Sequence, residues 1–362
     1  MSQERCAITR DSVRDRDGNP AIGPVRDPVS GFEIPREWIE RSGDPCALDK
    51  IRSGKWVLLS DGRMLLRGYT TGTTSAAACK GAVLSLAIAP VERLEIVDIM
   101  TPAGIRVSLT VEARAGICRA VKDGGDHQFD ITNGIEVLAK ATKAERIELI
   151  AGKGIGSITA GGLCAPQGRP AISQSARRQI MRAIEEGLEM TGLDGAVVEL
   201  TVPRGREIAI LTLNPQLGVA GGISILGSTG FVEPWNDHLA ISRNEEIKGL
   251  KKVLVTTGRT GLKYSRILFP DHQAVLLGSY LDRLQFDEEQ DSILCGLPAL
   301  ILKWAWPEIL AGTGYRTVAE MVEREPEHSC INAAIEKARA RLPLTRIVLL
   351  HKDGRILRDL GP

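Results

Sequence analysis

Aromatic residues, net charge and long apolar runs are all scarce in this sequence. Phenylalanine, tryptophan and tyrosine make up 4% of its 362 residues, and the formal net charge is only +1. Such a chain lacks the stacking platforms and the basic surface that nucleic-acid binding requires. A membrane helix needs about 18 consecutive apolar residues, and the longest candidate, 293–310, is interrupted by Pro298, Lys303 and Pro307. We therefore expect neither a nucleic-acid partner nor a membrane span.

Paired cysteines are also missing, although the chain contains seven cysteines. They are far apart in the sequence and form no C-x-x-C pair, which argues against a disulfide framework and against a structural zinc site. The first residues, MSQERCAITRD, contain no apolar signal segment. These features favour a cytoplasmic location. The cysteines are Cys6, Cys46, Cys79, Cys118, Cys164, Cys295 and Cys330.

Length and local pattern predict two domains that follow an N-terminal extension. A chain of 362 residues is longer than one ordinary hydrophobic core. Residues 1–60 lack sustained periodicity and predict an irregular extension. Residues 61–232 mix strand-like and helical patterns, which indicates an α+β domain. Residues 233–362 repeat compact apolar runs followed by helical sequence, which is typical of β/α units in an α/β domain with a mainly parallel sheet.

Several individual elements can be predicted within the first domain. Small hydroxyl residues before an alanine-rich run predict a loop over 68–74 that leads into a helix. Alternating apolar and polar residues predict strands, a helical period predicts a helix over 175–192, and 133–144 is expected to begin as a helix. The predicted strands cover 93–101, 105–115, 117–124, 146–159 and 196–209, the last as two strands joined at Pro203–Gly205.

Four glycine-containing segments are the candidate ligand-binding loops. Glycine allows close backbone approach and positive φ, so such loops can present N–H donors to a ligand. A helix that begins at Thr71–Ser75 would also favour an anionic group. Neither a P-loop nor a convincing G-x-G-x-x-G pattern occurs, and each loop taken alone is more often a structural turn than a ligand loop. The segments are RGYTTGTTSAAA (67–78), KDGGDHQFDITNG (122–134), AGKGIGSITAGG (151–162) and LNPQLGVAGGISILGSTGFVEP (213–234).

Charged residues in and near these loops suggest further roles. Asp123, Asp126 and Asp130 could converge on a hard cation, but the EF-hand spacing is absent and we predict no metal site. A carboxylate of this group could instead contact a cofactor or act in proton transfer. Basic residues between Lys153 and Arg178 are expected at the surface, where arginine would match the carboxylates of an acidic ligand.

Taken together and in this order, the four segments resemble those of the CbiD family. The first reads Gly68-Tyr69-Thr70-Thr71-Gly72-Thr73, and the longest match runs through 213–230. His127 and Phe129 replace the family's usual acidic and proline residues. The element at 295–303, CGLPALILK, replaces a G-H-x-G-K-x-x-K-like pattern, so that only one lysine remains.

The resemblance implies methyl transfer from S-adenosylmethionine to ring carbon 1 of cobalt-precorrin-5B in anaerobic cobalamin biosynthesis. It implies a domain like the second domain of ribosomal protein S5, followed by a Rossmann-like domain, and a cobalt-corrin polycarboxylate as partner. A homo-oligomer is compatible with it. The altered 295–303 element leaves an alternative open, namely a non-methylating paralogue that carries a tetrapyrrole or another polycarboxylate. The expected roles are catalytic for Thr71, Asp123 and Asp126, cofactor-binding for Gly72, Thr73, Gly221, Gly222, Ser224, Gly227, Thr229 and Gly258, and substrate-binding for Lys153 and Arg178.

Overall fold

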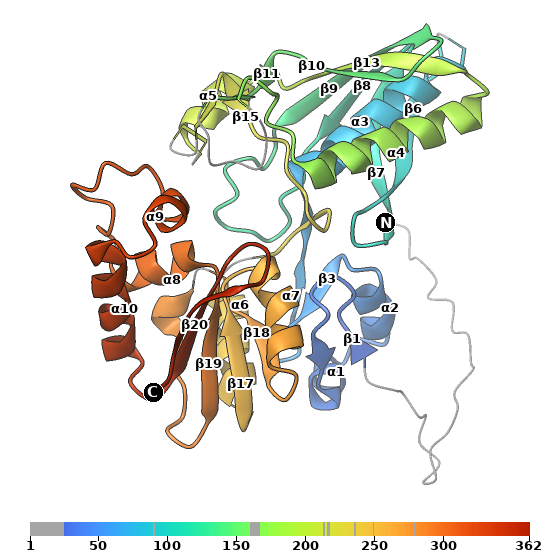
Figure 1. The fold of residues 1–362 in the computed structure, drawn as a ribbon. Helices are drawn as coiled ribbons and strands as arrows, with labels where there is room; N and C mark the ends of the chain where they lie inside the picture. The colour runs from blue at the N-terminus through green and yellow to red at the C-terminus, as the bar shows by residue number, and fades with distance from the viewer. Residues whose placement is uncertain are drawn as a thin grey trace.

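The structure is a computed structural model that describes residues 25–362 apart from a few short gaps. Figure 1 shows a lobe with a large sheet and two long helices, and a second lobe with its own sheet beside the short N-terminal elements. Parts of the predictions above, including residues 1–24, Cys164 and Leu213, lie outside the described residues. The gaps are 90, 160–166, 213, 216–217, 235–236, 249 and 279, and the side chains of 237–241 and 259 are not described either.

A six-stranded sheet forms the first lobe, in the order β10-β13-β9-β8-β7-β6. Its pairs are antiparallel except β10 with β13. Every second residue of β7 is buried, as expected for a sheet with one face covered and one exposed. The strands are β6 (Leu94–Met100), β7 (Arg106–Arg114), β8 (Ile117–Val121), β9 (Glu136–Ala144), β10 (Glu148–Ala151) and β13 (Gly195–Thr201).

Two helices of different character cover this sheet. Helix α3 (Thr71–Leu84) packs between the sheet and helix α4 (Gln174–Thr191), and it is buried on all sides. Its small residues allow that close packing: a side chain at Gly81 would lie 2.6 Å from the Cys118 sulfur. Helix α4 is amphipathic, with Ile180 and Ile184 fully buried, because only its inner face meets α3.

Short strands and one short helix connect the sheet to the loops of the predicted motifs. Parallel β11 and β15 pair Gly154 with Gly222, and antiparallel β12 and β14 pair Ile158 with Val219. Antiparallel β5 and β16 pair Tyr69 with Phe231. The bounds are β5 (Gly68–Tyr69), β11 (Gly154–Ile155), β12 (Ser157–Ile158), α5 (Gly205–Ile210), β14 (Val219–Ala220), β15 (Gly222–Ile223) and β16 (Phe231–Val232).

The C-terminal lobe contains a five-stranded sheet in the order β18-β17-β19-β20-β21, parallel except for β21. β17 (Lys252–Thr256), β19 (Asp291–Gly296) and β20 (Arg346–Leu350) are buried beyond their first residue. Both faces of the sheet are therefore covered, as parallel sheets require. The remaining elements are α6 (Asp237–Lys248), α7 (Arg259–Leu268), β18 (Gln273–Leu276), η1 (Leu281–Arg283), α8 (Pro298–Ala305), α9 (Val318–Arg324), α10 (Ser329–Arg341) and β21 (Ile356–Leu360).

Residues 25–66 are folded, which corrects the prediction of an irregular extension for that part of 1–60. Phe32, Trp38 and Ile51 form a small apolar core of their own. The backbone N–H of Ser60 donates to the Ser242 hydroxyl of α6 at 2.8 Å, so this segment is attached to the C-terminal lobe. Its elements are β1 (Val25–Arg26), β2 (Glu33–Ile34), α1 (Arg36–Ser42), α2 (Ala47–Arg52), β3 (Trp56–Leu58) and β4 (Met64–Leu66).

Two other local predictions are wrong. The segment expected to begin as a helix at 133–144 forms β9, because its residues pair with β8 and β13 and tertiary pairing outweighs helix propensity. The second of the two strands expected in 196–209 is instead helix α5, which begins directly after Pro203 and Arg204. Within the described residues, no helix is long and apolar enough to cross a membrane.

Candidate functional site

The beginning of helix α3 is one wall of the candidate site. Thr70 caps the helix, and its hydroxyl accepts the N–H of Thr73 at 3.2 Å. The N–H of Gly72 donates to the carbonyl of Leu226 at 2.8 Å. These first-turn N–H groups are therefore bonded to protein acceptors, so they do not form the anion site that the sequence favoured here.

Thr71, Gly72 and Thr73 attach the helix to the fourth glycine segment. The Thr71 hydroxyl accepts the N–H of Leu226 at 2.8 Å, and the Thr73 hydroxyl donates to the Gly230 carbonyl at 2.8 Å. A side chain at Gly72 would lie 2.9 Å from the Leu226 oxygen. All three residues thus hold two motif segments in contact.

The loop 122–134 contributes a buried charged pair. Lys122 is only 3% exposed, and its ammonium group pairs with the carboxylate of Asp130. Asp130 also accepts the hydroxyl of Thr132 at 2.6 Å. Although burial opposes the shift, Lys122 and Thr132 lower the pKa of Asp130. The carboxylate of Asp130 is therefore held ionised directly beside the buried Lys122 side chain.

Asp123 and Asp126 belong to the same loop but are engaged on its outer side. Asp123 pairs with Lys55 at 2.9 Å and accepts the N–H of Gly125 at 2.8 Å. Asp126 accepts the N–H of Leu66 at 2.7 Å. Neither side chain lines the cavity described below. Within the described part of the chain, no group of three His, Cys, Asp or Glu residues could hold a metal ion.

His127 presents a neutral imidazole to this region. Partial burial and the charge of Lys122 lower its pKa, against the opposing effect of Asp130. Its Nδ1 accepts the N–H of Phe129 at 3.1 Å. The neutral ring therefore carries its proton on Nε2 and can act there as a hydrogen-bond donor.

The fourth glycine segment forms the opposite wall. The Ser224 hydroxyl donates to the Asn214 side chain at 3.0 Å, and the Asn214 amide donates to the Gly222 carbonyl at 3.3 Å. A side chain at Gly222 would lie 2.2 Å from the oxygen of Gly154. Only glycine permits this approach of two backbones, which brings the third and fourth glycine segments together.

A cavity of about 300 Å³ lies where three of these segments meet. Most of its lining residues have polar side chains, yet apolar groups also line it, and among these Phe129 and Leu226 are 70% and 54% exposed. The site thus combines hydroxyl, amide and charged groups with apolar surface, a composition typical of small-molecule sites. The lining residues are Thr70, Thr71, Lys122, His127, Phe129, Asp130, Thr132, Thr212, Asn214, Ile223, Ser224, Leu226 and Val232.

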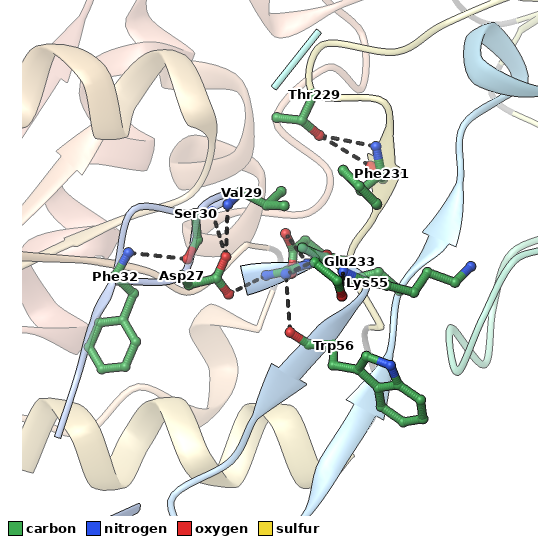
Figure 2. A network of polar contacts seen from close by, with 12 residues as sticks. Asp27, Val29, Ser30, Phe32, Lys55, Trp56, Thr229, Phe231 and Glu233 are labelled. Carbon is green, nitrogen blue, oxygen red and sulfur yellow. Dashed lines mark hydrogen bonds and ion pairs between the residues drawn. The ribbon is translucent and has the colours of Figure 1, made fainter. Parts of the chain in front are cut away.

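Other predicted site residues lie near the cavity without lining it. Gly227 contacts Thr70, where a side chain would lie 2.5 Å from the hydroxyl. The Thr229 hydroxyl accepts the N–H of Phe231 at 3.3 Å, as Figure 2 shows. Gly221 has a φ of +80° between β14 and β15, next to Gly222. These residues shape the backbone of the fourth segment.

Three predicted residues lie elsewhere. Gly258 follows β17 and precedes α7 in the C-terminal lobe. Lys153 and Arg178 are exposed, and neither lines the cavity. Of the predicted roles, only Thr71 and Ser224 therefore belong to residues of the cavity wall. Sequence reasoning assigned no role to Lys122 or Asn214 and named Asp130 only as one of three candidate aspartates, although all three lie within the motif segments.

Comparisons with known proteins agree with these motifs. The family model named CbiD matches residues 59–234. A protein of Methanosarcina acetivorans named cobalt-precorrin-5B C(1)-methyltransferase is 48% identical over 337 residues, which is 92% of this chain and 98% of that protein. A protein of Methanococcoides burtonii with the same name is 46% identical over 339 residues, 93% of this chain and 98% of that protein.

A solved structure extends the likeness to the fold. The crystal structure of the cobalamin biosynthesis protein cbiD from Archaeoglobus fulgidus superimposes with a TM-score of 0.72 at 33% identity. The superposition covers 90% of this chain and 100% of the chain in that crystal structure. The mixed α and β fold, the ordered motifs and the near-complete coverage agree. This chain is a member of the CbiD family.

Proposed function

We propose that this protein transfers a methyl group from S-adenosylmethionine to ring carbon 1 of cobalt-precorrin-5B in anaerobic cobalamin biosynthesis. The observation that carries the proposal is the convergence of three motif segments on one cavity, within the region that matches the family. The names of relatives that are 46–48% identical over nearly the whole chain support the same reaction.

Methyl transfer places modest chemical demands on such a site. The sulfonium of the donor supplies an activated methyl group, so the protein must mainly align the reactants and exclude water. The cavity offers hydroxyl and amide groups for orientation, and the paired side chains of Lys122 and Asp130 can complement ligand groups of opposite charge. The exposed faces of Phe129 and Leu226 suit the apolar surface of a macrocycle.

The size of the cavity suggests that the two reactants occupy different parts of the protein. Small-molecule sites span about 300–1,000 Å³, so a cavity of about 300 Å³ accommodates one small reactant or one arm of a macrocycle. A complementary site is offered by the C-terminal sheet. Its order corresponds to 2-1-3-4-5, in which ligands bind beyond the carboxyl ends of the first and third strands. Gly258 lies just after the first of these strands, β17, and Gly296 is the last residue of the third, β19.

This strand order also supports the two domain types that the resemblance implies. We propose that 61–232 is a domain like the second domain of ribosomal protein S5 and that 233–362 is Rossmann-like. Residues 25–60 are then an ordered N-terminal part attached to the second domain. The changed element at 295–303 would lie at the end of β19 and in α8, close to Gly258.

The predicted residue roles are refined accordingly. Thr71, Asp123 and Asp126 remain proposed as essential residues, but their hydrogen bonds favour a role in holding the loops. Gly72, Thr73, Gly221, Gly222, Gly227 and Thr229 would shape the cavity, Ser224 would contact a reactant, and Gly258 would contact the donor. Lys153 and Arg178 are proposed to meet carboxylate arms of the substrate outside the cavity.

Calorimetric titration tests the proposal directly. Purified protein would be titrated with S-adenosylmethionine and S-adenosylhomocysteine, with and without a cobalt-corrin precursor. We expect micromolar binding of both adenosyl compounds. Binding of the corrinoid alone would favour the alternative of a carrier that does not methylate, and binding of none of them would contradict the proposal.

A further inference from the structure

A fully buried arginine lies directly before the first motif segment. The side chain of Arg67 is 0% exposed. It contacts Asp27 at 2.5 Å and Glu233 at 3.2 Å, and it donates to the carbonyl of Gly54 at 3.0 Å. Figure 2 shows Asp27, Glu233 and the Trp56 carbonyl converging on this point. One guanidinium therefore joins segments that are far apart in the sequence.

Asp27 and Arg67 of this network are held in the ionised state. Burial by itself would raise the pKa of Asp27, but Arg67 and the N–H groups of Ser30 and Val29 outweigh it and lower the pKa. Burial also opposes the charge of Arg67, yet Glu233 and Asp27 raise its pKa. A buried ion pair that loses one partner leaves an uncompensated charge, so these residues depend on one another.

Two residues of the network extend the pairing of the strands next to the cavity. β5 and β16 pair Gly68 with Val232, and Arg67 and Glu233 are the next residues along each strand. Val232 lines the cavity. The ion pair therefore fixes how the end of the fourth motif segment lies against the first.

The opposite side of the same strand holds the aspartate loop. The N–H of Tyr69 donates to the Asp123 carbonyl at 2.7 Å, and the N–H of Asp126 donates to the Leu66 carbonyl at 2.9 Å. This loop supplies Lys122, His127 and Asp130 to the cavity. A shift of residues 66–69 would thus move two walls of the cavity together.

Asp27 connects this arrangement to the C-terminal lobe. It belongs to the turn between β1 and β2, and its carboxylate accepts the N–H of Val29 at 2.9 Å. In the same turn, the Gly31 carbonyl accepts a hydrogen bond from Arg266 of α7 at 3.2 Å. The β1–β2 hairpin (25–34) therefore contacts α7 on one side and Arg67 on the other.

We propose that Arg67 is a positioning residue for methyl transfer, and that the β1–β2 hairpin acts through Asp27 as a brace that sets the cavity walls relative to the C-terminal lobe. The proposal rests on the proposed function. It also gives a role to a segment in which the sequence alone indicated no structure. Because a misplacement of about 1 Å can cost roughly a hundredfold in rate, loss of the brace is expected to affect turnover.

The test uses Asp27→Asn, which keeps the size of the side chain but removes its charge. Glu33→Gln is the matched control, because Glu33 lies in the same hairpin and forms an exposed pair with Arg26. We expect kcat to fall about tenfold to a hundredfold in Asp27→Asn, with KM nearly unchanged and the control close to wild type. Rates are measured well below the unfolding temperature, so that a purely structural role would leave kcat per folded molecule unchanged.

Hydrogen exchange provides a second readout that does not require activity. Amides in peptides 64–72, 122–134 and 226–234 should exchange faster in Asp27→Asn, whereas 252–256 and 291–296 should exchange as in wild type. Asp27→Glu, which retains the carboxylate, should show exchange between that of wild type and that of Asp27→Asn. If Asp27→Asn does not fold, Asp27→Glu is compared with wild type in its place. Unchanged exchange and unchanged kcat would overturn the proposal. If wild type transfers no methyl group, the proposed function fails, while the exchange comparison still decides whether the brace exists.

Discussion

The two lobes use their glycines in different ways. In the first lobe, side chains at Gly68 or Gly154 would lie 2.2 Å or 1.9 Å from backbone atoms of other segments. In the C-terminal lobe, a side chain at Gly258 would meet no atom within 4 Å. The first lobe therefore uses glycine to bring backbones into contact and to form a cavity. In the C-terminal lobe Gly258 has open space, and the close contacts of Gly261 and Gly354 are with side chains, at 2.2 Å from the Thr256 hydroxyl and 2.3 Å from the Tyr264 ring.

Two ion pairs, one in each lobe, differ in burial. Lys122 and Asp130 lie in the wall of the cavity with side chains 2% and 11% exposed. Lys352 and Glu323 of the C-terminal lobe are 60% and 56% exposed, although that lobe also contains a buried pair in α6, Arg243 with Glu246. The first pair is thus part of the cavity wall, whereas the second is a surface pair.

The largest effect is expected from Gly68→Ala. Its new methyl group would collide with the backbone of Gly124 at 2.2 Å, so we expect a loss of about 3 kcal/mol in the free energy of unfolding and nearly complete loss of methyl transfer. Gly258→Ala, which has open space, should change stability little. Urea unfolding of both variants checks the difference, and equal stability would contradict the contrast between the lobes.

Lys122→Met should be the next most damaging change. It leaves Asp130 without its ammonium partner in a largely buried place, which costs about 3 kcal/mol and should also weaken ligand binding. Lys352→Met breaks an exposed pair and should cost about 0.5 kcal/mol or less. Thermal or urea unfolding measures both. A Lys122→Met protein as stable and as active as the Lys352 variant would argue against a role for the buried pair.

A smaller effect than these is expected in acid, where Asp27 and Asp359 should differ in how much each carboxylate stabilises the fold. Arg67 lowers the pKa of Asp27 despite burial, so the folded protein binds a proton there less readily than the unfolded chain. The stabilisation is present above the unfolded pKa of about 3.9 and is lost as pH falls through the lower folded pKa.

The free energy of unfolding of wild type should therefore exceed that of Asp27→Asn by about 2 kcal/mol near neutral pH. This gap should shrink below about pH 4. Asp359→Asn should give a smaller gap, because solvent screens its partly exposed pair with Arg346. Urea unfolding across this pH range measures both. A gap that stays constant in acid would mean that Asp27 does not stabilise the fold through its charge.

The smallest effect concerns thiol reactivity, in which the two lobes should agree. Burial raises the pKa of Cys118 to about 12 and that of Cys295 to about 11, so neither should react with a maleimide in the folded protein. Among the cysteines that the structure describes, Cys46 and Cys330 are only partly buried and should react before Cys118 and Cys295. Mass spectrometry of labelled peptides locates the modified thiols, and early labelling of Cys118 would show that the first core opens readily.

The sequence predicted most reliably the elements with a strong period. Helix α4 shows a clear apolar stripe, and the buried strands of the C-terminal lobe appear as compact apolar runs. Residues 133–144 lacked such a signal, because their alanine and lysine content is compatible with a helix until β8 and β13 pair with them. The N-terminal elements escaped detection because they are short and depend on contacts with distant residues such as Arg67 and Ser242.

Sequence reasoning identified the segments of the site better than the individual side chains. Thr71 and Ser224 are in the cavity wall, but the choice among three neighbouring aspartates depended on how the loop folds. The backbone of Leu66 engages Asp126, and Lys55 engages Asp123, which leaves Asp130 for the cavity. Spacing alone contains no information on these partners.

Transfer of a labelled methyl group tests the central claim most directly. Wild type and Lys122→Met would be incubated with S-adenosylmethionine labelled in its methyl group and with cobalt-precorrin-5B, and the product would be examined by nuclear magnetic resonance. We predict label at ring carbon 1 with wild type and a strongly reduced rate with the folded variant. No label with wild type, or an equal rate with the variant, would contradict the assignment of methyl transfer to this cavity.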